Sequence, residues 1–329
     1  MVDVQTWRNR LISEAGLDKA MADAIARLAR PNIRLTVRTD PPDVALPLGA
    51  SKFGGRPDLP PGESWPHRPP YAPSPFWDHG RGPRSAPLSF LAQINLGDIQ
   101  AAGGTDLPLP TSGLLSFFYD VEVMPWGFDP VDAPGFRVLY HDSDWIERTS
   151  PPDSLAEDWQ FSEHALQMDA GESIPTVDSD AVERLLARFP DRKSIRPRFL
   201  DALVRFVRSD VFRRPDRREM WSRLFGALEP FASSGHVVGG WPHPVQNAME
   251  GECQYVSNGV YCGSPQDFDS ERARELEPGT RDWRLILQLS SDDAAGWMWG
   301  DVGNLYFWIR HPDLAHRRFD RVWTILQCG

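Results

Sequence analysis

Residues 283–309, WRLILQLSSDDAAGWMWGDVGNLYFWI, carry the clearest structural signal in the chain. The apolar runs at their two ends, 285–289 and 305–309, predict two strands that are covered on both faces. The connection between these strands is much longer than the two to five residues of an ordinary hairpin loop. Long polar and aromatic loops on a rigid scaffold often carry function. The candidate ligand-binding residues in this connection are Asp292, Asp293, Trp297, Trp299 and Asp301.

The side chains of this loop allow two interpretations. The three aspartates could bind a hard cation or a cationic or polar ligand, with the two tryptophans as an aromatic wall. Alternatively, the aspartates cap turns and the indole rings fill the interface between two halves of the chain, which is the more common use of such residues. Both interpretations remain open from the sequence.

Composition excludes several classes of protein. The net charge of −11 argues against nucleic acid and against an anionic membrane surface as partners. Three cysteines give no disulfide framework and favour a reducing compartment. The N-terminal residues have no apolar segment of signal-peptide length, and no run of eighteen apolar residues occurs. We therefore expect a cytoplasmic protein.

The hydrophobic periodicity changes along the chain, which we treat as one domain over residues 1–329. Helical spacing predicts N-terminal helices within 1–30 and a helical subdomain at 178–231. Strand patterns predict a first β-rich half at 33–148 and a second at 234–329. Within the second half, Asn258-Gly259 predicts a tight β-hairpin across residues 253–262.

The two β-rich halves contain the same three motifs in the same order. A double-glycine turn recurs at an offset of 185 residues, a strand with one glutamine at 195, and a glycine-started apolar strand at 190. The paired segments are 53–57 and 238–242, 90–94 and 285–289, and 113–117 and 303–307. This ordered set predicts an α+β fold with internal duplication. The two mainly antiparallel halves would pack about a pseudo-twofold axis, with the N-terminal helices and a helical insertion between the halves.

Each copy of the second motif has a glutamine within an apolar strand, Gln93 and Gln288. A buried amide needs hydrogen-bond partners, so each glutamine either ties down its double-glycine turn or contacts a ligand. Ligand sites often lie at the interface between such units. His236, Trp241 and His243 flank the second double-glycine turn and complete the set of candidate ligand-binding residues.

The motif set resembles the YwqG-like family, also called DUF1963. The residues that carry the resemblance are 54–66, 90–96, 125–130, 238–246 and 287–309, and the similarity runs from about residue 33 to the C-terminus. The resemblance implies an α+β fold with internal duplication in a bacterial protein family that has no agreed activity. Some relatives look like neighbours of toxin and immunity genes, which implies protein binding.

Motifs for several chemistries are missing from the sequence. There is no nucleophile elbow, no phosphate-binding loop and no dinucleotide fingerprint. Histidines, acids and cysteines cluster between residues 236 and 262, but without the closely spaced ligand pairs typical of zinc sites. We therefore predict no metal, no cofactor and no identifiable catalytic residue.

Our leading hypothesis is a non-enzymatic binding module of toxin-immunity type, for an unknown protein or small-molecule ligand. It would present the interface between the halves and the loop around residues 290–304 to that partner. The alternative is an enzyme of unrecognised type, in which Asp292, Asp293 or Asp301 works with His236 or His243 in acid–base chemistry.

Overall fold

The structure is a computed structural model. It describes residues 4–13, 19–38, 45–74, 82–176, 179–186, 235–264 and 266–329. The strands are β1 (Arg30–Val37), β2 (Lys52–Phe53), β3 (Asp58–Leu59), β4 (His67–Arg68), β5 (Ala86–Pro87), β6 (Ser89–Asn95), β7 (Leu114–Tyr119), β8 (Phe136–His141), β9 (Glu147–Arg148), β10 (His164–Ser173), β11 (His236–Gly239), β12 (Trp283–Ser290), β13 (Asn304–Arg310) and β14 (Trp323–Gln327).

The described helices are short. They are α1 (Val4–Ser13), α2 (Lys19–Ala26), α3 (Leu96–Ala101), α4 (Asp180–Leu186), α7 (Glu250–Val256), α8 (Glu271–Leu276) and α9 (His311–Ala315). Short 3-10 turns are η1 (Pro130–Gly135), η2 (Glu157–Trp159), η5 (Asp267–Asp269), η6 (Glu277–Asp282) and η7 (Phe319–Arg321). The helices expected between residues 3 and 30 are present as α1 and α2. Of the helical subdomain expected at 178–231, only the segment containing α4 lies within the described residues.

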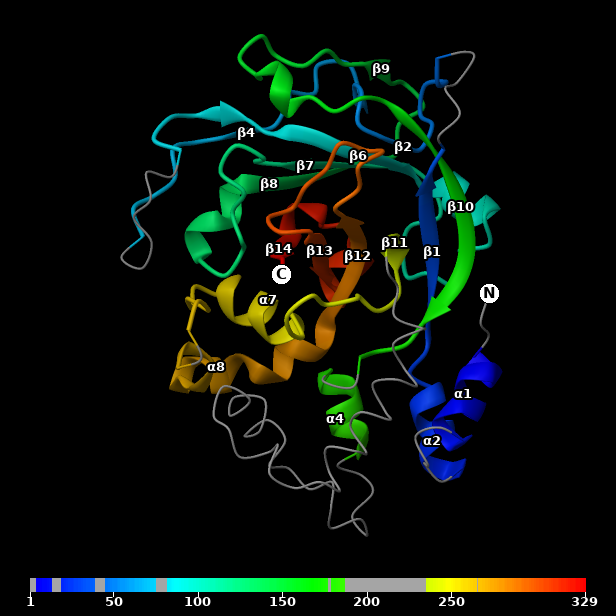
Figure 1. Cartoon of the computed structure of the whole chain (residues 1–329). Coiled ribbons are helices and arrows are strands. Elements are labelled where there is room, and N and C mark those ends of the chain that lie inside the picture. The colour runs from blue at the N-terminus through cyan, green and yellow to red at the C-terminus, as the bar shows by residue number, and fades with distance from the viewer. Residues whose placement is uncertain are drawn as a thin grey trace.

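One antiparallel sheet of ten strands organises the described part of the chain, in the order β14-β13-β12-β11-β1-β10-β2-β6-β7-β8. The long strands β1 and β10 lie at its centre, and β6 to β8 and β11 to β14 extend from them on opposite sides (Figure 1). We call β2, β6, β7 and β8 the first-half strands, and β11 to β14 the second-half strands. The class is therefore α+β, with a large, nearly closed antiparallel sheet and few helices.

The two central strands, β1 and β10, pair with strands that are not next to them in sequence. β1 pairs with β10 over its whole length, from Arg30 with Ser173 to Val37 with Leu166. On its other side β1 pairs with β11, and β10 pairs with β2. Each central strand therefore joins the half of the sheet that does not follow it in the chain.

Gln93 ties the first double-glycine turn to strand β6. Its side-chain oxygen accepts from the backbone N–H of Asp58 at 2.8 Å, and its amide nitrogen donates to the carbonyl of Ala50 at 2.9 Å. These partners are the residues four positions after and four positions before Gly54. Because Gln93 is fully buried, water cannot replace these partners of its side-chain amide.

Gln288 makes the same two bonds in the second half. It accepts from the backbone N–H of His243 at 2.9 Å and donates to the carbonyl of Gly235 at 2.8 Å. These positions are again four after and four before a turn glycine, Gly239. All four turn glycines have positive φ angles between 59° and 72°, which side chains rarely adopt. Both glutamines therefore tie down their turns, as one of the two interpretations predicted.

The irregularities of the sheet also correspond between the halves. β6 shifts register against β7 between Phe90 and Ala92, and β12 shifts against β13 between Leu285 and Leu287. These positions differ by the same 195 residues as the sequence motifs. A bulge increases local twist and bends its strand, so both sides of the sheet curve at matching places.

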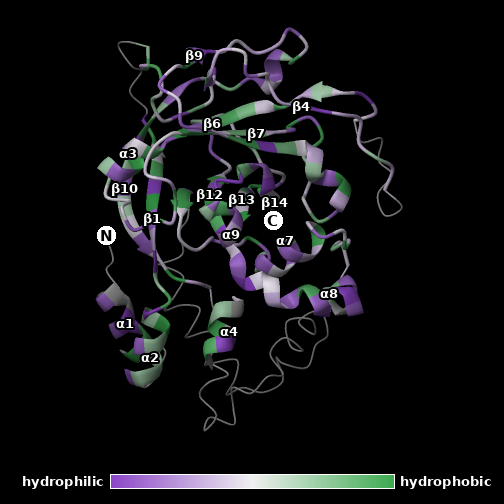
Figure 2. Ribbon diagram, turned by 180° about the vertical axis from the view of Figure 1, so that it is seen from behind, coloured by the Kyte–Doolittle hydropathy of each residue, from purple (hydrophilic) through white to green (hydrophobic). Residues whose placement is uncertain are grey.

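The curvature folds the two sides of the sheet over a common core. Hydrophobic residues concentrate along β6, β7, β12 and β13 in the middle of the molecule (Figure 2). The rings of Phe117 and Phe307, which occupy corresponding positions in β7 and β13, meet edge to face with centroids 5.1 Å apart. Such contacts between the halves bury large apolar surfaces, which is the main stabilising term in folding.

The turn at residues 125–129 connects the two outer edges of the sheet. The Trp323 indole N–H of β14 donates to the carbonyl of Gly127 at 2.8 Å, and its ring packs against Phe136 of β8. Gly127 has a φ of 87°, and a Cβ atom there would lie 2.0 Å from the carbonyl oxygen of Thr324. Only glycine allows this approach.

The expected hairpin across residues 253–262 is wrong. Residues 250–256 form helix α7, and Met249, Cys253 and Val256 are buried at helical spacing. Gly259, with a φ of 87°, lies in the turn that ends this helix, where the N–H of Val260 bonds back to the Tyr255 carbonyl at 3.1 Å. The Asn-Gly pair can supply a left-handed residue to a hairpin turn or to the end of a helix. The helical spacing of the apolar residues favours the helix.

We predict that Gln93→Leu and Gln288→Leu each lower the free energy of unfolding by about 2–4 kcal/mol, because each removes two hydrogen bonds that hold a double-glycine turn. Urea unfolding measures this effect, and the two losses should agree to within about 1 kcal/mol. Gln167→Leu, at an exposed position of β10, is the control and should change stability by less than about 0.5 kcal/mol. A small loss for only one of the two buried glutamines would contradict this prediction.

Candidate functional site

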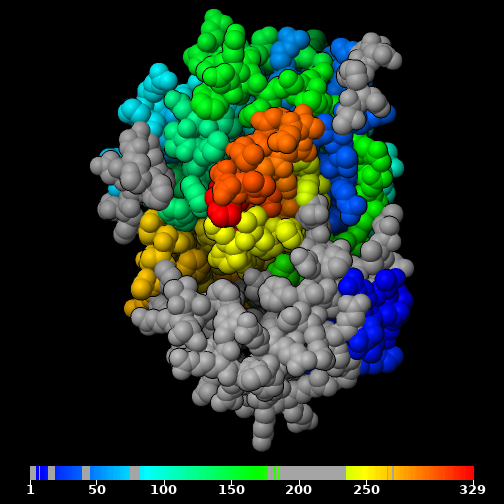
Figure 3. Space-filling view, viewed as in Figure 1, coloured from blue at the N-terminus to red at the C-terminus, as the bar shows by residue number. Residues whose placement is uncertain are grey.

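The segment from Ser291 to Gly303, which we call the 291–303 loop, is held rigidly by its own backbone. Asp292 and Trp297 form a two-bond bridge in which each N–H donates to the other carbonyl at 2.9 Å. The Ser291 hydroxyl donates to the carbonyl of Gly303 and accepts from the N–H of Trp299. The loop forms the orange patch in the middle of the face shown in Figure 3.

The inner face of the loop consists of two buried indole rings. Trp297 and Trp299 are 2% and 1% exposed, with ring centroids 5.7 Å apart. Trp297 packs against Phe53 of β2 at 4.7 Å, and Trp299 meets Tyr119 of β7 edge to face. The rings therefore fill the interface between the halves, and a ligand could reach them only if the loop opened.

His236 connects the loop to strand β12. Its Nδ1 lies 3.1 Å from the backbone nitrogen of Ser290, and its Nε2 lies 3.0 Å from Oδ2 of Asp292. A backbone N–H can only donate, so Nδ1 must accept and the ring proton must be on Nε2. His236 is therefore a neutral imidazole that donates to the Asp292 carboxylate.

The electrostatic environment favours the same protonation states. Burial lowers the pKa of His236 below its ordinary value, and the hydrogen bond to Asp292 opposes this only in part. For Asp292, burial alone would raise the pKa, but the bonds from His236 and from the backbone N–H groups of Ala294 and Ala295 outweigh it and lower the pKa. Near neutral pH the pair is thus an uncharged histidine beside a carboxylate that also caps a turn.

The first half contains the same bridge made from other residues. The Ser51 hydroxyl accepts from the N–H of Asn95 at 2.8 Å and contacts the Asp98 carboxylate at 2.7 Å. Ser51 corresponds to His236 at the offset of 185 residues, and Asn95 corresponds to Ser290 at 195. Because the serine achieves the same connection without titrating near neutral pH, the geometry of His236 fits a positioning role. Both of its ring nitrogens are engaged, so neither can accept a proton from a substrate in this arrangement.

The outer face of the loop is exposed and combines apolar with acidic side chains. Met298 and Val302 are 50% and 68% exposed, and Asp293 and Asp301 of the same loop are also exposed. Val302 has a φ of 52°, a strained conformation for a β-branched residue. The backbone is therefore locked in a shape that presents this face to solvent.

The structure brings only some of the predicted site residues together. His236, Asp292, Trp297 and Trp299 meet, as just described, whereas Trp241 lies apart from them. Its indole N–H donates to the Leu28 carbonyl at 2.6 Å, and the Arg30 guanidinium stacks 3.4 Å from its ring centre.

The backbone of His243 is used by its neighbours in the second half. Its N–H donates to Gln288, and its carbonyl accepts from the Tyr306 hydroxyl at 2.6 Å. Among the described residues, no three histidine, cysteine, aspartate or glutamate side chains gather closely enough to hold a metal ion. No helix in the described ranges is long and apolar enough to cross a membrane.

A buried charge cluster beside the first double-glycine turn was not predicted. Asp58, at the position that corresponds to His243, is fully buried, and its carboxylate accepts from Arg148 at 2.9 Å and from Gln93 at 3.0 Å. Lys52, also fully buried, contacts Glu163 at 3.1 Å. Burial would raise the pKa of Asp58, but the hydrogen bonds it receives lower the pKa below the ordinary value. No sequence signal joined these residues, because Gln93, Arg148 and Glu163 are far along the chain from Lys52 and Asp58.

A second unpredicted cluster centres on Asp120, directly after β7. Its Oδ2 accepts from the Tyr71 hydroxyl at 2.9 Å and from Nε of the fully buried Arg68. Its Oδ1 accepts from the N–H groups of Glu122 and Val123, both at 3.2 Å. Burial and the nearby Asp120 raise the pKa of Tyr71, which stays a neutral donor. Asp120 therefore fixes the start of the turn that carries Glu122.

These features define an antiparallel scaffold with one anchored, exposed loop. The model of one protein family, described as a domain of unknown function (DUF1963), matches residues 51–328. The chain belongs to the DUF1963 family. The match begins after β1, later than the resemblance near residue 33 suggested. No curated protein matches the chain.

We predict that stability falls as pH drops below about 6.5, because the unfolded state then binds a proton that neutral His236 in the folded state does not. His236→Gln can keep both hydrogen bonds without titrating, so its stability should depend less on pH between about 7.5 and 5.5. Urea unfolding across this range tests the difference, and nitrogen NMR should find the Nε2–H tautomer in the native chain. An unchanged pH dependence in the variant would refute the assignment.

Proposed function

We propose that this protein is a non-enzymatic binding module whose 291–303 loop presents its outer face to a protein partner. The observation that carries this proposal is the division of the loop into an anchored inner face and an exposed outer face. A preorganised surface loses little conformational entropy on binding, which favours recognition. A protein partner can cover the exposed side chains of both Met298 and Val302, whereas a small molecule needs an enclosed pocket.

The chemistry of the outer face suggests what the partner offers. Asp293 and Asp301 contribute negative charge on a chain whose net charge is −11. Complementary charge speeds association and excludes wrong partners. We therefore infer a partner with basic groups around an apolar depression that accepts Met298 and Val302. A protein partner of this kind also fits a toxin-immunity role.

We also infer that the fold arose by internal duplication, with its halves related by a pseudo-twofold axis. Support comes from the matching bonds of Gln93 and Gln288 and from the bulges at corresponding positions of β6 and β12. The exchange of β1 and β10 between the halves fits the same relation. Buried free thiols at Cys253, Cys262 and Cys328 support a cytoplasmic location.

Site-specific photo-crosslinking in the source cells tests the partner surface. A photo-reactive residue in place of Val302 should give one discrete adduct, because the partner covers this position. Asp301→Lys together with Asp293→Lys should weaken the adduct at least about tenfold by reversing the local charge. Mass spectrometry of the adduct identifies the partner.

The matched control places the same photo-reactive residue at Trp145, which is 78% exposed on a different segment. Equal adducts from both positions, or an adduct that survives the charge reversal, would contradict binding through the loop. All variants should keep wild-type stability to within about 0.5 kcal/mol, because the substituted side chains are exposed.

The contact between His236 and Asp292 supports an enzyme as the second candidate. In that case a substrate would have to displace Ser290 or Asp292 from the imidazole. His236→Gln distinguishes the two functions: it should abolish any activity of an enzyme but leave the crosslink at Val302 intact.

A further inference from the structure

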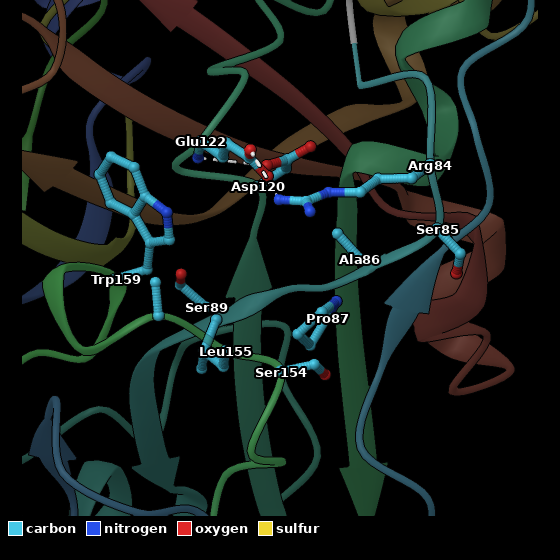
Figure 4. Close-up of a pocket in the computed structure, with 11 residues that line it drawn as sticks. Arg84, Ser85, Ala86, Pro87, Ser89, Asp120, Glu122, Ser154, Leu155 and Trp159 are labelled. Atoms are coloured by element: carbon cyan, nitrogen blue, oxygen red, sulfur yellow. Dashed lines mark hydrogen bonds and ion pairs between the residues drawn. The ribbon is translucent and has the colours of Figure 1, made fainter.

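A pocket of about 130 Å³ lies against strand β5, the start of β6 and the turn after β7 (Figure 4). Its position separates it from the proposed partner surface, because none of its lining residues belongs to the 291–303 loop. It is lined by Arg84, Ser85, Ala86, Pro87, Ser89, Asp120, Glu122, Ser154, Leu155, Ala156 and Trp159. This volume suits a molecule the size of a small amino acid.

The carboxylate of Glu122 has unused hydrogen-bonding capacity at this pocket. Among the described residues, its nearest cationic atoms are on Arg68 at 3.5 Å and Arg84 at 3.6 Å, both beyond good hydrogen-bond distance. The Glu122 side chain is 39% exposed, so a ligand can reach it. Asp120 behind it is already saturated by four donors, which leaves Glu122 as the acceptor available to a bound amine.

Arg84 is a guanidinium that can change partner at little cost. Its side chain is 77% exposed, and an exposed ion pair at 3.6 Å adds little stability. In Figure 4 its guanidinium extends toward Asp120 and Glu122 across one side of the pocket. If a ligand amine took its place beside Glu122, Arg84 would be free to bind a carboxylate in the bidentate geometry that guanidinium favours.

The remaining walls suit a short carbon skeleton. Leu155 is buried, and Pro87 and Leu155 face the two charged residues from the opposite side of the pocket (Figure 4). The half-buried Trp159 closes the end nearest Glu122, where its ring can contact a cationic group. Ser89, 1% exposed, adds a hydroxyl that can bond to either end of a ligand.

We propose that this pocket binds a small zwitterionic molecule of the amino-acid class. Its ammonium group pairs with Glu122 beside Trp159, and its carboxylate pairs with Arg84. Binding replaces one long internal ion pair by two charge-assisted pairs, while the skeleton contacts the apolar wall. A molecule with only one of the two charges forms only one of these two ion pairs. The pocket therefore discriminates against simple amines and simple carboxylates.

Isothermal titration of the full chain with L-alanine, ethylamine and propionate tests the proposal. L-alanine should bind saturably at concentrations up to about 10 mM, at least about tenfold more tightly than either singly charged probe. Glu122→Gln and Arg84→Gln should each weaken L-alanine binding about tenfold. Glu147→Gln, an exposed carboxylate in β9 outside the pocket, is the matched control and should bind like the wild type.

Three results would overturn the proposal: no saturable binding of L-alanine, equal binding of ethylamine or propionate, or unchanged binding in both pocket variants. Thermal unfolding of each variant shows whether the chain is folded, and Glu122 and Arg84 are exposed enough that their substitution should keep the fold. Crosslinking at Val302 is a separate readout. Failure of either proposal therefore leaves the other standing.

Discussion

The requirement that a buried amide be fully bonded governs this fold. Gln93 and Gln288 are fully buried in their strands. The side-chain oxygen and nitrogen of each glutamine form hydrogen bonds that hold a double-glycine turn. Those turns can close only because their glycines adopt left-handed conformations. The two amides thus fix how β2 and β11 enter the sheet, and with them the positions of Ser51 and His236.

The 291–303 loop inherits its rigidity from this arrangement. His236 stands in β11 and holds Asp292, and the loop then turns two indoles inward against the first-half strands. The same bonds that satisfy buried groups therefore also orient the exposed side chains of Met298 and Val302. Stability and presentation of a surface are two results of one set of contacts.

Much of the sheet could be predicted from the sequence, because β6, β7, β12 and β13 are continuous apolar runs. β10 was not predicted, although Leu166, Met168 and Ala170 alternate with the polar Gln167 and Asp169, because most of its residues are only partly buried. Yet it pairs with the whole of β1 at the centre of the sheet. Long-range pairing, which local propensity does not encode, selects this strand.

The site was predictable only in part. The sequence identified the loop, but not which of its residues face inward, because Trp297, Met298 and Trp299 are neighbours with alternating burial. Likewise, Arg68, Asp120 and Glu122 come together through the packing of separate segments. Clusters of residues that are distant in sequence can be recognised only in the three-dimensional structure.

The exchange of β1 and β10 between the two sides of the sheet has a consequence for biosynthesis. β1 is synthesised before both of its pairing partners, because β10 is complete only at Ser173 and β11 only at Gly239. The edge that pairs with β11 stays open until Gly239 is made, a condition that slows folding and invites aggregation. Nascent chains of this protein should therefore need a chaperone until the second-half strands are complete, and neither half should mature without the other.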